Sequence, residues 1–129
     1  MLAIVTRPRM HRIENRDVDS GHARFARALD RGGVDRRGSV ACLLANTPEY
    51  LSAYRGATWS GRRFTPMSGR WLASEVEYVV ENCEADCLVV DARYADRVAS
   101  AAHSVPEENR YSVGGAIPGF RRYEEVEAL

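Results

Sequence analysis

Lysine is missing from this chain of 129 residues, because each of its 18 basic residues is an arginine. A Walker-type phosphate loop needs a lysine to reach the nucleotide phosphates, so the sequence excludes that loop. Schiff-base chemistry on a lysine amine is excluded for the same reason. Any nucleotide-binding or catalytic role must therefore depend on other residue types.

Cysteine is scarce, and its three positions do not suggest a disulfide framework. An odd set of thiols, Cys42, Cys83 and Cys87, in a chain without a secretion signal favours free cysteines. Cys83 and Cys87 are four residues apart, but no Cys/His pair follows to complete the four ligands of a zinc site. We expect three unpaired thiols in packing positions.

Long apolar runs are also missing, and none approaches the ~20 residues that cross a bilayer. The short apolar start precedes the first arginines, which is the wrong order for a secretory signal. Hydrophobic residues make up 45% and charged residues 28% of the chain, as in ordinary globular proteins. We therefore expect a cytoplasmic protein without a membrane span.

Charge is balanced overall but unevenly distributed along the chain. Residues 1–37 contain nine arginines and five acids, a balance of +4, and the remainder contains nine arginines and thirteen acids, a balance of −4. The basic start could contact nucleic acid or another anionic surface. It could equally form a solvated helix face preceded by an irregular arm.

Strand and helix patterns alternate along the chain. Residues 1–21 have no clear periodicity and predict an irregular basic N-terminal arm. Alternation over residues 22–129 predicts an α/β domain with a mostly parallel sheet of about four strands and helices on both faces. Strands are expected near 39–45, 62–67, 87–91 and 110–115, and helices near 21–31, 48–59, 74–83, 94–102 and from 121 onward. Pro66 places the second strand near a sheet edge, because proline cannot donate to a ladder.

Two helix starts carry local signals. Thr47 suits an N-cap, Pro48 suits the first helical position, and Glu49 complements the positive end of the helix dipole. Ser74 and Glu77 have the spacing of a capping box for the next helix. These residues predict helix boundaries, not a ligand site.

Catalytic signatures are missing from the sequence. No serine stands in Gly-x-Ser-x-Gly, no histidine pair has metal-ligand spacing, and no G-x-G-x-x-G follows a strand. The spacing of Glu75, Glu77, Glu81 and Glu84 is typical of a solvated helix face, and Gly114–Gly115 predicts only a turn. We predict no catalytic, cofactor-binding or metal-binding residue in this chain.

An ordered series of short motifs surrounds the first two strand–helix units. Asn-x-Pro-Glu-Tyr stands at 46–50, Gly-Ala and Ser-Gly within 56–61, and Thr-Pro at 65–66. This series, within residues 22–129, resembles the N-terminal region of AMP-forming acyl-CoA synthetases, and its form is most similar to that of actinobacterial fatty-acid–CoA ligases. The matching positions, which we expect to be structural, are Asn46, Pro48, Glu49, Tyr50, Gly56, Gly61, Thr65, Pro66, Arg70, Glu75 and Tyr78.

The resemblance implies a reaction and a set of missing parts. The family joins a carboxylate to ATP as an acyl-adenylate and then transfers the acyl group to coenzyme A, with Mg²⁺ balancing phosphate charge. Its lysine-bearing phosphate loop and catalytic lysine have no counterpart here, so ATP, Mg²⁺ and coenzyme A are expected only for a complete enzyme. The chain is therefore expected to be the first subdomain of a ligase, incomplete at its C-terminal end and inactive alone, with the remaining ligase domains as partners.

The sequence also departs from the family pattern. Arg62 and Arg63 stand where the family has apolar residues, in a strand expected to be covered. Two other functions stay open: a stand-alone module that forms homo-oligomers, and nucleic-acid binding through the arginine-rich start.

Overall fold

The computed structural model describes residues 15–127, which build a five-stranded sheet in which every neighbouring pair is parallel. The spatial order of the strands is β2-β1-β3-β4-β5, one strand more than expected. The elements are α1 (Asn15–Arg31), β1 (Ser39–Leu43), α2 (Pro48–Thr58), β2 (Arg63–Pro66), α3 (Ala73–Asn82), β3 (Cys87–Asp91), the 3₁₀ turns η2 (Ala92–Arg97), η3 (Ala101–Ser104) and η4 (Glu107–Asn109), β4 (Arg110–Val113), β5 (Arg121–Arg122) and α4 (Tyr123–Glu127).

The two central strands explain why the sheet is parallel. Every residue of β1 and β3 is buried, as expected for strands that are covered on both faces. Their register places Cys42 opposite Val89, and β2 pairs on the other side of β1 with Pro66 opposite Cys42. The expected position of Pro66 on an edge strand is confirmed.

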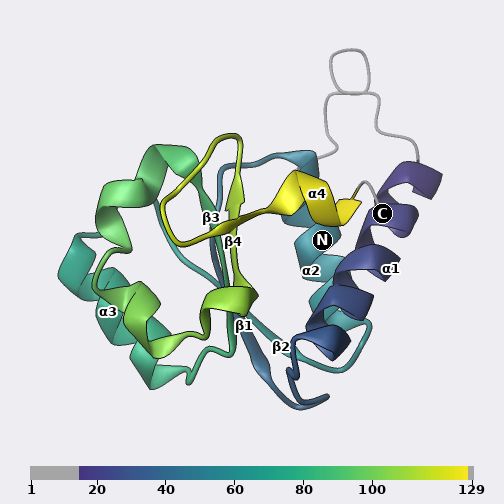
Figure 1. The fold of residues 1–129 in the computed structure, drawn as a ribbon, viewed down its shortest axis with the longest axis horizontal. Helices are drawn as coiled ribbons and strands as arrows, with labels where there is room; N and C mark the ends of the chain where they lie inside the picture. Colours follow the sequence, from purple (N-terminus) through teal and green to yellow (C-terminus); the bar gives the residue numbers. More distant parts are fainter. Residues whose placement is uncertain (1–14, 128–129) are drawn as a thin grey trace.

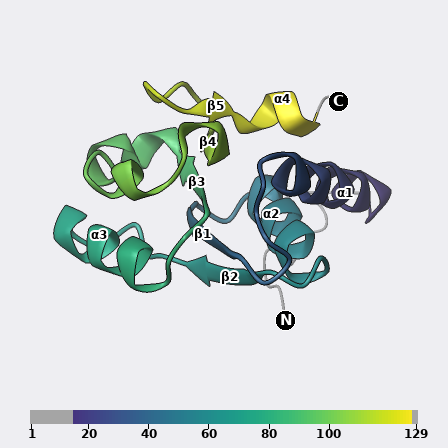
Figure 2. The same cartoon turned by 60° about the horizontal axis from the view of Figure 1, so that its bottom comes forward.

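Helices cover both faces of the sheet, as predicted (Figure 1). Figure 2 shows α1 and α2 on one side of β1–β3 and α3 on the other. We call the face under α1, α2 and α4 the first face; its core contains Val40, Cys42, Cys87 and Val89. The second face lies under α3 and the 3₁₀ turns, and its core contains Ala41, Leu43, Leu88 and Val90. Alternate strand residues therefore serve the two cores.

Aromatic rings fill the first face. Phe25 of α1, Tyr111 of β4 and Tyr123 of α4 are almost fully buried, and their ring centroids lie 5.3–6.2 Å apart. The hydroxyl oxygens of Tyr123 and Ser52 are 2.8 Å apart and hydrogen-bonded, which connects α4 to α2. The helix predicted at the C-terminal end thus forms, and it is anchored through its first residue.

Several boundaries differ from those predicted. Helix α1 already begins at Asn15, inside the segment 1–21 that was expected to be irregular, and residues 1–14 lie outside the described part. Helix α3 begins at Ala73, because the Glu75 carboxylate, not Glu77, accepts a hydrogen bond from the backbone N–H of Leu72 at 2.7 Å. The capping box of Ser74 and Glu77 was therefore wrong.

The helix predicted near 94–102 was also wrong. The segment between β3 and β4 forms the 3₁₀ turns η2, η3 and η4, and Tyr94 has non-helical dihedral angles of φ −106° and ψ 16°. Apolar residues three and four apart fit either kind of helix over so short a span. Among residues 15–127, no helix is long and apolar enough to cross a membrane.

Of the two arginines at the start of β2, one is buried and the other is exposed. The Arg62 side chain is only 1% exposed, whereas Arg63 is exposed. Arg62 Nη2 donates to Asp30 Oδ1 at 2.7 Å and to the Val34 carbonyl at 2.6 Å. The Nε and Nη1 groups of Arg62 donate to the Asp35 carbonyl and the Ser60 hydroxyl. A buried guanidinium is tolerated here because each of its nitrogens is hydrogen-bonded.

Candidate functional site

The carboxyl edge of the sheet is the first place to look for a site. The chain leaves β1 toward α2 on the first face and leaves β3 toward η2 on the second face. Ligands of open parallel sheets bind in the crevice outside the strand ends where such connections diverge. The motif residues that follow β1 and β2 belong to this edge.

The start of α2 lies at this edge and matches the sequence prediction in its backbone. Thr47 is extended, with φ −132° and ψ 166°, Pro48 is the first helical residue, and Glu49 lies in the first turn. Thr47 is the N-cap residue, as predicted, but its side chain makes no capping hydrogen bond to the described residues. Asn46 is exposed, and the Tyr50 ring packs edge-on against Phe64 of β2 with centroids 5.8 Å apart.

Side chains occupy the space beside the carboxyl ends of β2 and β3. A Cβ atom on Gly69 would lie 2.6 Å from the Tyr94 ring, so the ring is packed directly on this glycine. Arg97 Nη1 donates to the backbone carbonyls of Gly69 and Trp71, and its guanidinium lies 5.7 Å from the Tyr94 ring centroid. Turn η2 therefore holds the segment after β2 in place and fills this part of the edge.

The Gly114–Gly115 turn at the end of β4 does not fit a nucleotide phosphate. Gly114 has φ +78°, and its backbone N–H donates to Glu124 Oε2 at 2.9 Å. A carboxylate thus occupies the position in which a phosphate oxygen would be bound, and its charge would repel phosphate. Glu124 is in turn paired with Arg122 at 3.5 Å.

The residues present do not fit the ATP and Mg²⁺ that the family resemblance implies. In the described part of the chain, no group of three or more His, Cys, Asp and Glu side chains is arranged to hold a metal ion. The whole sequence offers no lysine for the phosphates. No chemical step through these groups is therefore assigned to this chain.

The other motif residues have structural surroundings. A Cβ atom on Gly56 would lie 2.9 Å from the His22 carbonyl and from the Phe25 ring, so glycine lets α1 approach α2 closely. Gly61 adopts φ +91° after α2, a conformation that glycine takes without steric cost. Thr65 and Pro66 pair with Ala41 and Cys42 of β1.

The remaining motif positions belong to the segment around α3. Glu75 caps α3 through the Leu72 N–H, and the backbone N–H of the exposed Arg70 donates to the Ser68 hydroxyl at 3.1 Å. Tyr78 is 67% exposed on the outer side of α3. The motif residues are thus distributed over both faces and do not converge on one ligand position.

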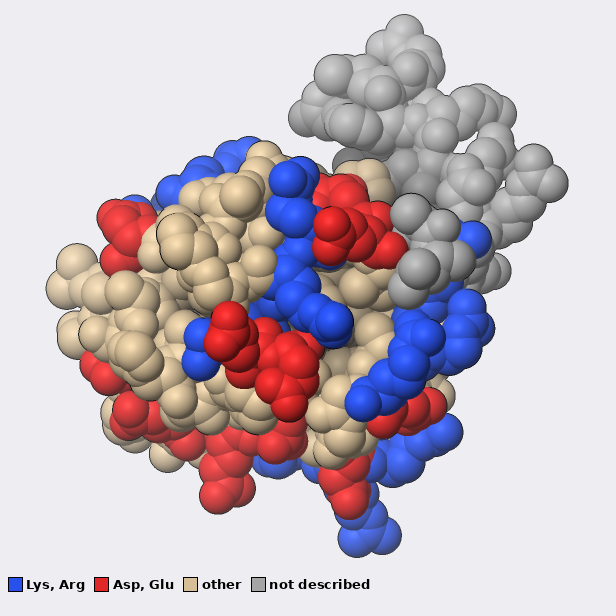
Figure 3. All heavy atoms as spheres, in the orientation of Figure 1, with Lys and Arg blue, Asp and Glu red and all other residues tan. Residues whose placement is uncertain are grey.

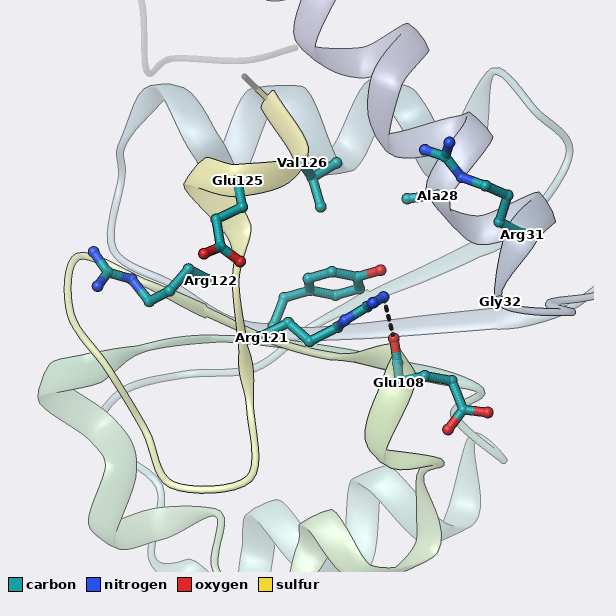
Figure 4. Close-up of a pocket in the computed structure, with 9 residues that line it drawn as sticks. Ala28, Arg31, Gly32, Glu108, Arg121, Arg122, Glu125 and Val126 are labelled. Carbon is teal, nitrogen blue, oxygen red and sulfur yellow. Dashed lines mark hydrogen bonds between the residues drawn. The ribbon is translucent and has the colours of Figure 1, made fainter. Parts of the chain in front are cut away.

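A cavity of about 460 Å³ lies away from these motifs, between the end of α1, the strands β4 and β5, and α4 (Figure 4). Arginine and acidic side chains alternate around the middle of the surface on this side of the molecule (Figure 3). Sequence reasoning missed the cavity, because its lining comes from residues 28–32 and 108–126, which are distant in the chain. In the sequence, only the arginine pair of β5 and the arginine at the end of α1 could have indicated this cavity.

Comparison with known proteins places the chain in context. A family model described as AMP-binding enzyme matches residues 3–125. The medium/long-chain-fatty-acid–CoA/3-oxocholest-4-en-26-oate–CoA ligase of Mycobacterium tuberculosis (strain ATCC 25618 / H37Rv) is 30% identical over 106 residues, which cover 81% of this chain and 19% of that enzyme. The 4-hydroxybutyrate–CoA ligase 2 of Metallosphaera sedula is 25% identical over 83 residues, 64% of this chain and 15% of the enzyme. The chain therefore spans less than a fifth of the length of these relatives.

Solved structures share the fold. A protein of Rhodopseudomonas palustris CGA009 that is assigned as a long-chain-fatty-acid CoA ligase superposes with a TM-score of 0.80 at 24% identity, over 88% of this chain and 29% of that protein. The acyl-CoA synthetase of Brucella canis superposes with a TM-score of 0.75 at 20% identity, over 87% of this chain and 21% of that chain. Both similarities establish the architecture of the described sheet and its helices.

Proposed function

This chain belongs to the family of AMP-binding enzymes, as the N-terminal region of an adenylate-forming acyl-CoA synthetase, and from that membership we propose that it is the scaffold subdomain of a fatty-acid–CoA ligase. The observation that carries the proposal is the family match over residues 3–125. In such a ligase, a fatty acid and ATP would form an acyl-adenylate, from which coenzyme A would capture the acyl group. The relative from M. tuberculosis supports medium- to long-chain fatty acids as the substrate class.

We propose further that the chain does not catalyse this reaction by itself. The complete absence of lysine and the Glu124 carboxylate on the Gly114 N–H both argue against phosphate binding. The motif glycines and Pro48 serve helix packing and helix boundaries instead. The contribution of the chain would be to hold the sheet and its outer surfaces in place for the rest of a cytoplasmic ligase.

The outer side of α3 is the surface that this role would use. Leu72 and Tyr78 are 68% and 67% exposed, and a groove of about 350 Å³ runs between Trp71, Tyr78 and Val79. A groove lined by large apolar side chains such as Trp71 and Tyr78 is typical of surfaces that contact another part of a protein. The M. tuberculosis relative is about four times as long as this chain, so the partner we expect on this surface is the remainder of the ligase.

ATP–pyrophosphate exchange tests whether the chain is inactive alone. The purified 129-residue chain, supplied with Mg²⁺ and medium- or long-chain fatty acids, should show no exchange above the blank. Its Val89→Asp variant, unfolded by a charge in the buried core and purified in the same way, reports contaminating ligase. ATP-dependent exchange by the parent chain, absent from the Val89→Asp sample, would contradict the proposal that it is inactive alone.

A chimera tests the scaffold role directly. The chain would replace the matching 106 residues of the M. tuberculosis ligase, and a deletion of the same residues would serve as the control. We expect the chimera to retain adenylation and the deletion to lose it, because only the chimera has the sheet. A folded chimera with no more exchange than the deletion would count against the scaffold role. The self-associating module and the nucleic-acid-binding protein stay predictions without support from the comparisons.

A further inference from the structure

The cavity beside α4 has the size and the chemistry of a small-molecule site. Its volume of about 460 Å³ lies within the roughly 300–1,000 Å³ that is usual for ligand pockets. Tyr111 at its base is 1% exposed, and the buried side chains of Ala28 and Val126 form an apolar wall. Arg31 and Arg121 stand at the opening. The cavity therefore combines an apolar interior with two guanidinium groups.

Both arginines act on the same buried phenol. Burial raises the pKa of Tyr111, so its hydroxyl stays a neutral donor at physiological pH. The neighbouring Arg121 guanidinium and the charge of Arg31 act in the opposite direction on that pKa. The phenol thus lies within electrostatic reach of guanidinium groups from two elements that are ninety residues apart in sequence.

The acidic side chains of the lining do not neutralise this pair. Figure 4 shows the Glu108 carboxylate directed away from the cavity, while the Glu108 backbone carbonyl accepts a hydrogen bond from Arg121 Nη1 at 3.4 Å. In the same view, Glu125 lies on the far side of Val126 from Arg31, beside Arg122. Arg122 points outward and pairs with Glu124 at 3.5 Å.

We propose that this cavity binds an organic anion, with its carboxylate or phosphate between Arg31 and Arg121 and its apolar body against Ala28 and Val126. Guanidinium groups bind both kinds of oxyanion through paired, charge-assisted hydrogen bonds. The Tyr111 hydroxyl offers a further donor at the base of the cavity. The site lies toward the amino end of β4, whereas the Gly114 turn lies at its carboxyl end.

Binding of three matched aromatic probes tests the proposal on the whole 129-residue chain. Benzoate and phenyl phosphate carry the two candidate head groups, and benzamide is their neutral counterpart. Titration followed by NMR should give saturable binding of at least one anion, with a Kd of about 1 mM, and much weaker binding of benzamide. The tighter of the two anions identifies the head group.

Two arginine neighbours provide a matched pair of variants. Arg121→Gln should weaken binding of the preferred anion by about tenfold or more, because a charge-assisted hydrogen bond contributes that much. Arg31→Gln should act in the same direction. Arg122→Gln changes a lining arginine whose side chain is exposed and directed outward, so Kd should change by no more than about twofold. All three side chains are exposed, so thermal unfolding should confirm that each variant folds like the parent.

Three outcomes would overturn the proposal. One is no saturation by either anion up to about 10 mM, tenfold above the expected Kd. The second is benzamide binding as tightly as benzoate. The third is an equal loss of affinity in Arg121→Gln and Arg122→Gln. The pyrophosphate-exchange result does not bear on any of these outcomes. The proposed anion site and the proposed ligase role can therefore be contradicted independently of each other.

Discussion

The two faces of the sheet are assembled in different ways. The first face brings together α1, α2 and α4, so its core joins Phe25 near one end of the described chain to Tyr123 and Val126 near the other. The core of the second face, apart from β1, comes from the continuous segment 67–117 that contains α3 and the 3₁₀ turns. Among the described residues, the buried aromatic rings of Phe25, Tyr111 and Tyr123 belong to the first core, and the buried residues of the second core are non-aromatic.

This difference suggests a division of roles. The first face closes the subdomain through contacts between its ends. Its one large exposed apolar side chain among the residues whose burial is described is Trp59, whose ring centroid lies 5.2 Å from the Arg55 guanidinium and 4.7 Å from the His22 ring. The second face leaves Leu72, the residue before α3, and Tyr78 of α3 about two-thirds exposed. Stability should therefore depend most on the first face, and contact with further sequence should depend most on the second.

The largest expected effect comes from emptying the aromatic core. Phe25→Ala should lower the free energy of unfolding by about 3–5 kcal/mol, because it leaves a cavity among buried rings. Val80→Ala, at an equally buried position of α3, should cost only about 2 kcal/mol, since fewer atoms are removed. Urea unfolding followed by circular dichroism measures both. Equal losses, or a larger loss at Val80, would contradict the division between the faces.

The hydrogen bond between Ser52 and Tyr123 should give the next largest effect. Ser52→Ala or Tyr123→Phe removes this buried hydrogen bond, which should cost about 1–3 kcal/mol. The double variant should be less destabilised than the sum of the two single variants, because each single variant already removes the same hydrogen bond. A strictly additive double-mutant cycle would show that the bond does not stabilise the docking of α4.

The first face and the central sheet follow from local patterns in the sequence. The apolar runs that became β1 and β3, and Pro66 on the edge strand β2, were predicted because burial on both faces leaves a continuous apolar run. The α2 helix was predicted through Pro48 and ends before Gly61, as expected. The family motif was recognised in the same region, and the family match confirms it.

The errors arise where structure depends on distant residues or on very short elements. Strand β5 has only two residues, both arginines, and has no pattern of its own. In the sequence, Arg62 stands as a charge in a strand that should be covered. Its hydrogen-bond partner Asp30 lies 32 residues earlier, so the local pattern does not show that the charge is paired. The cavity beside α4 joins Arg31 to Arg121, a pairing that only the docking of α4 and β5 creates.

The ion pair of Arg62 predicts a modest dependence of stability on pH. The Arg62 guanidinium, hydrogen-bonded to Asp30, lowers the pKa of that carboxyl below its ordinary value of 3.8, and Arg36 adds to the effect. A lowered folded-state pKa stabilises the protein above pH 3.8, and this contribution is lost as the pH falls through the folded value. Urea unfolding of the parent and of Asp30→Asn, at neutral pH and well below pH 3.8, should show their difference shrinking in acid. Parallel pH profiles would show that Asp30 titrates alike in both states.

The smallest expected effect is a difference in the reactivity of the cysteine thiols, which involves no change in the stability of the protein. Cys42 and Cys87 are buried in the first core, where burial raises the pKa of Cys42 to about 12 and also raises that of Cys87. Cys83, after α3, is only half-buried. A thiol reagent should therefore modify one cysteine quickly in the native protein and the other two only after unfolding, and Cys83→Ser should remove the fast reaction.

The slow thiols also report which face opens first. If both faces unfold as one unit, Phe25→Ala and Val80→Ala should each accelerate the slow modification in proportion to the unfolding free energy that they remove. If the first face opens alone, Phe25→Ala should accelerate modification of Cys42 and Cys87, whereas Val80→Ala should leave its rate near that of the parent. The second result would mean that the contacts between the chain ends form a separate unit of stability, and that α4 can leave the sheet while the α3 side stays folded.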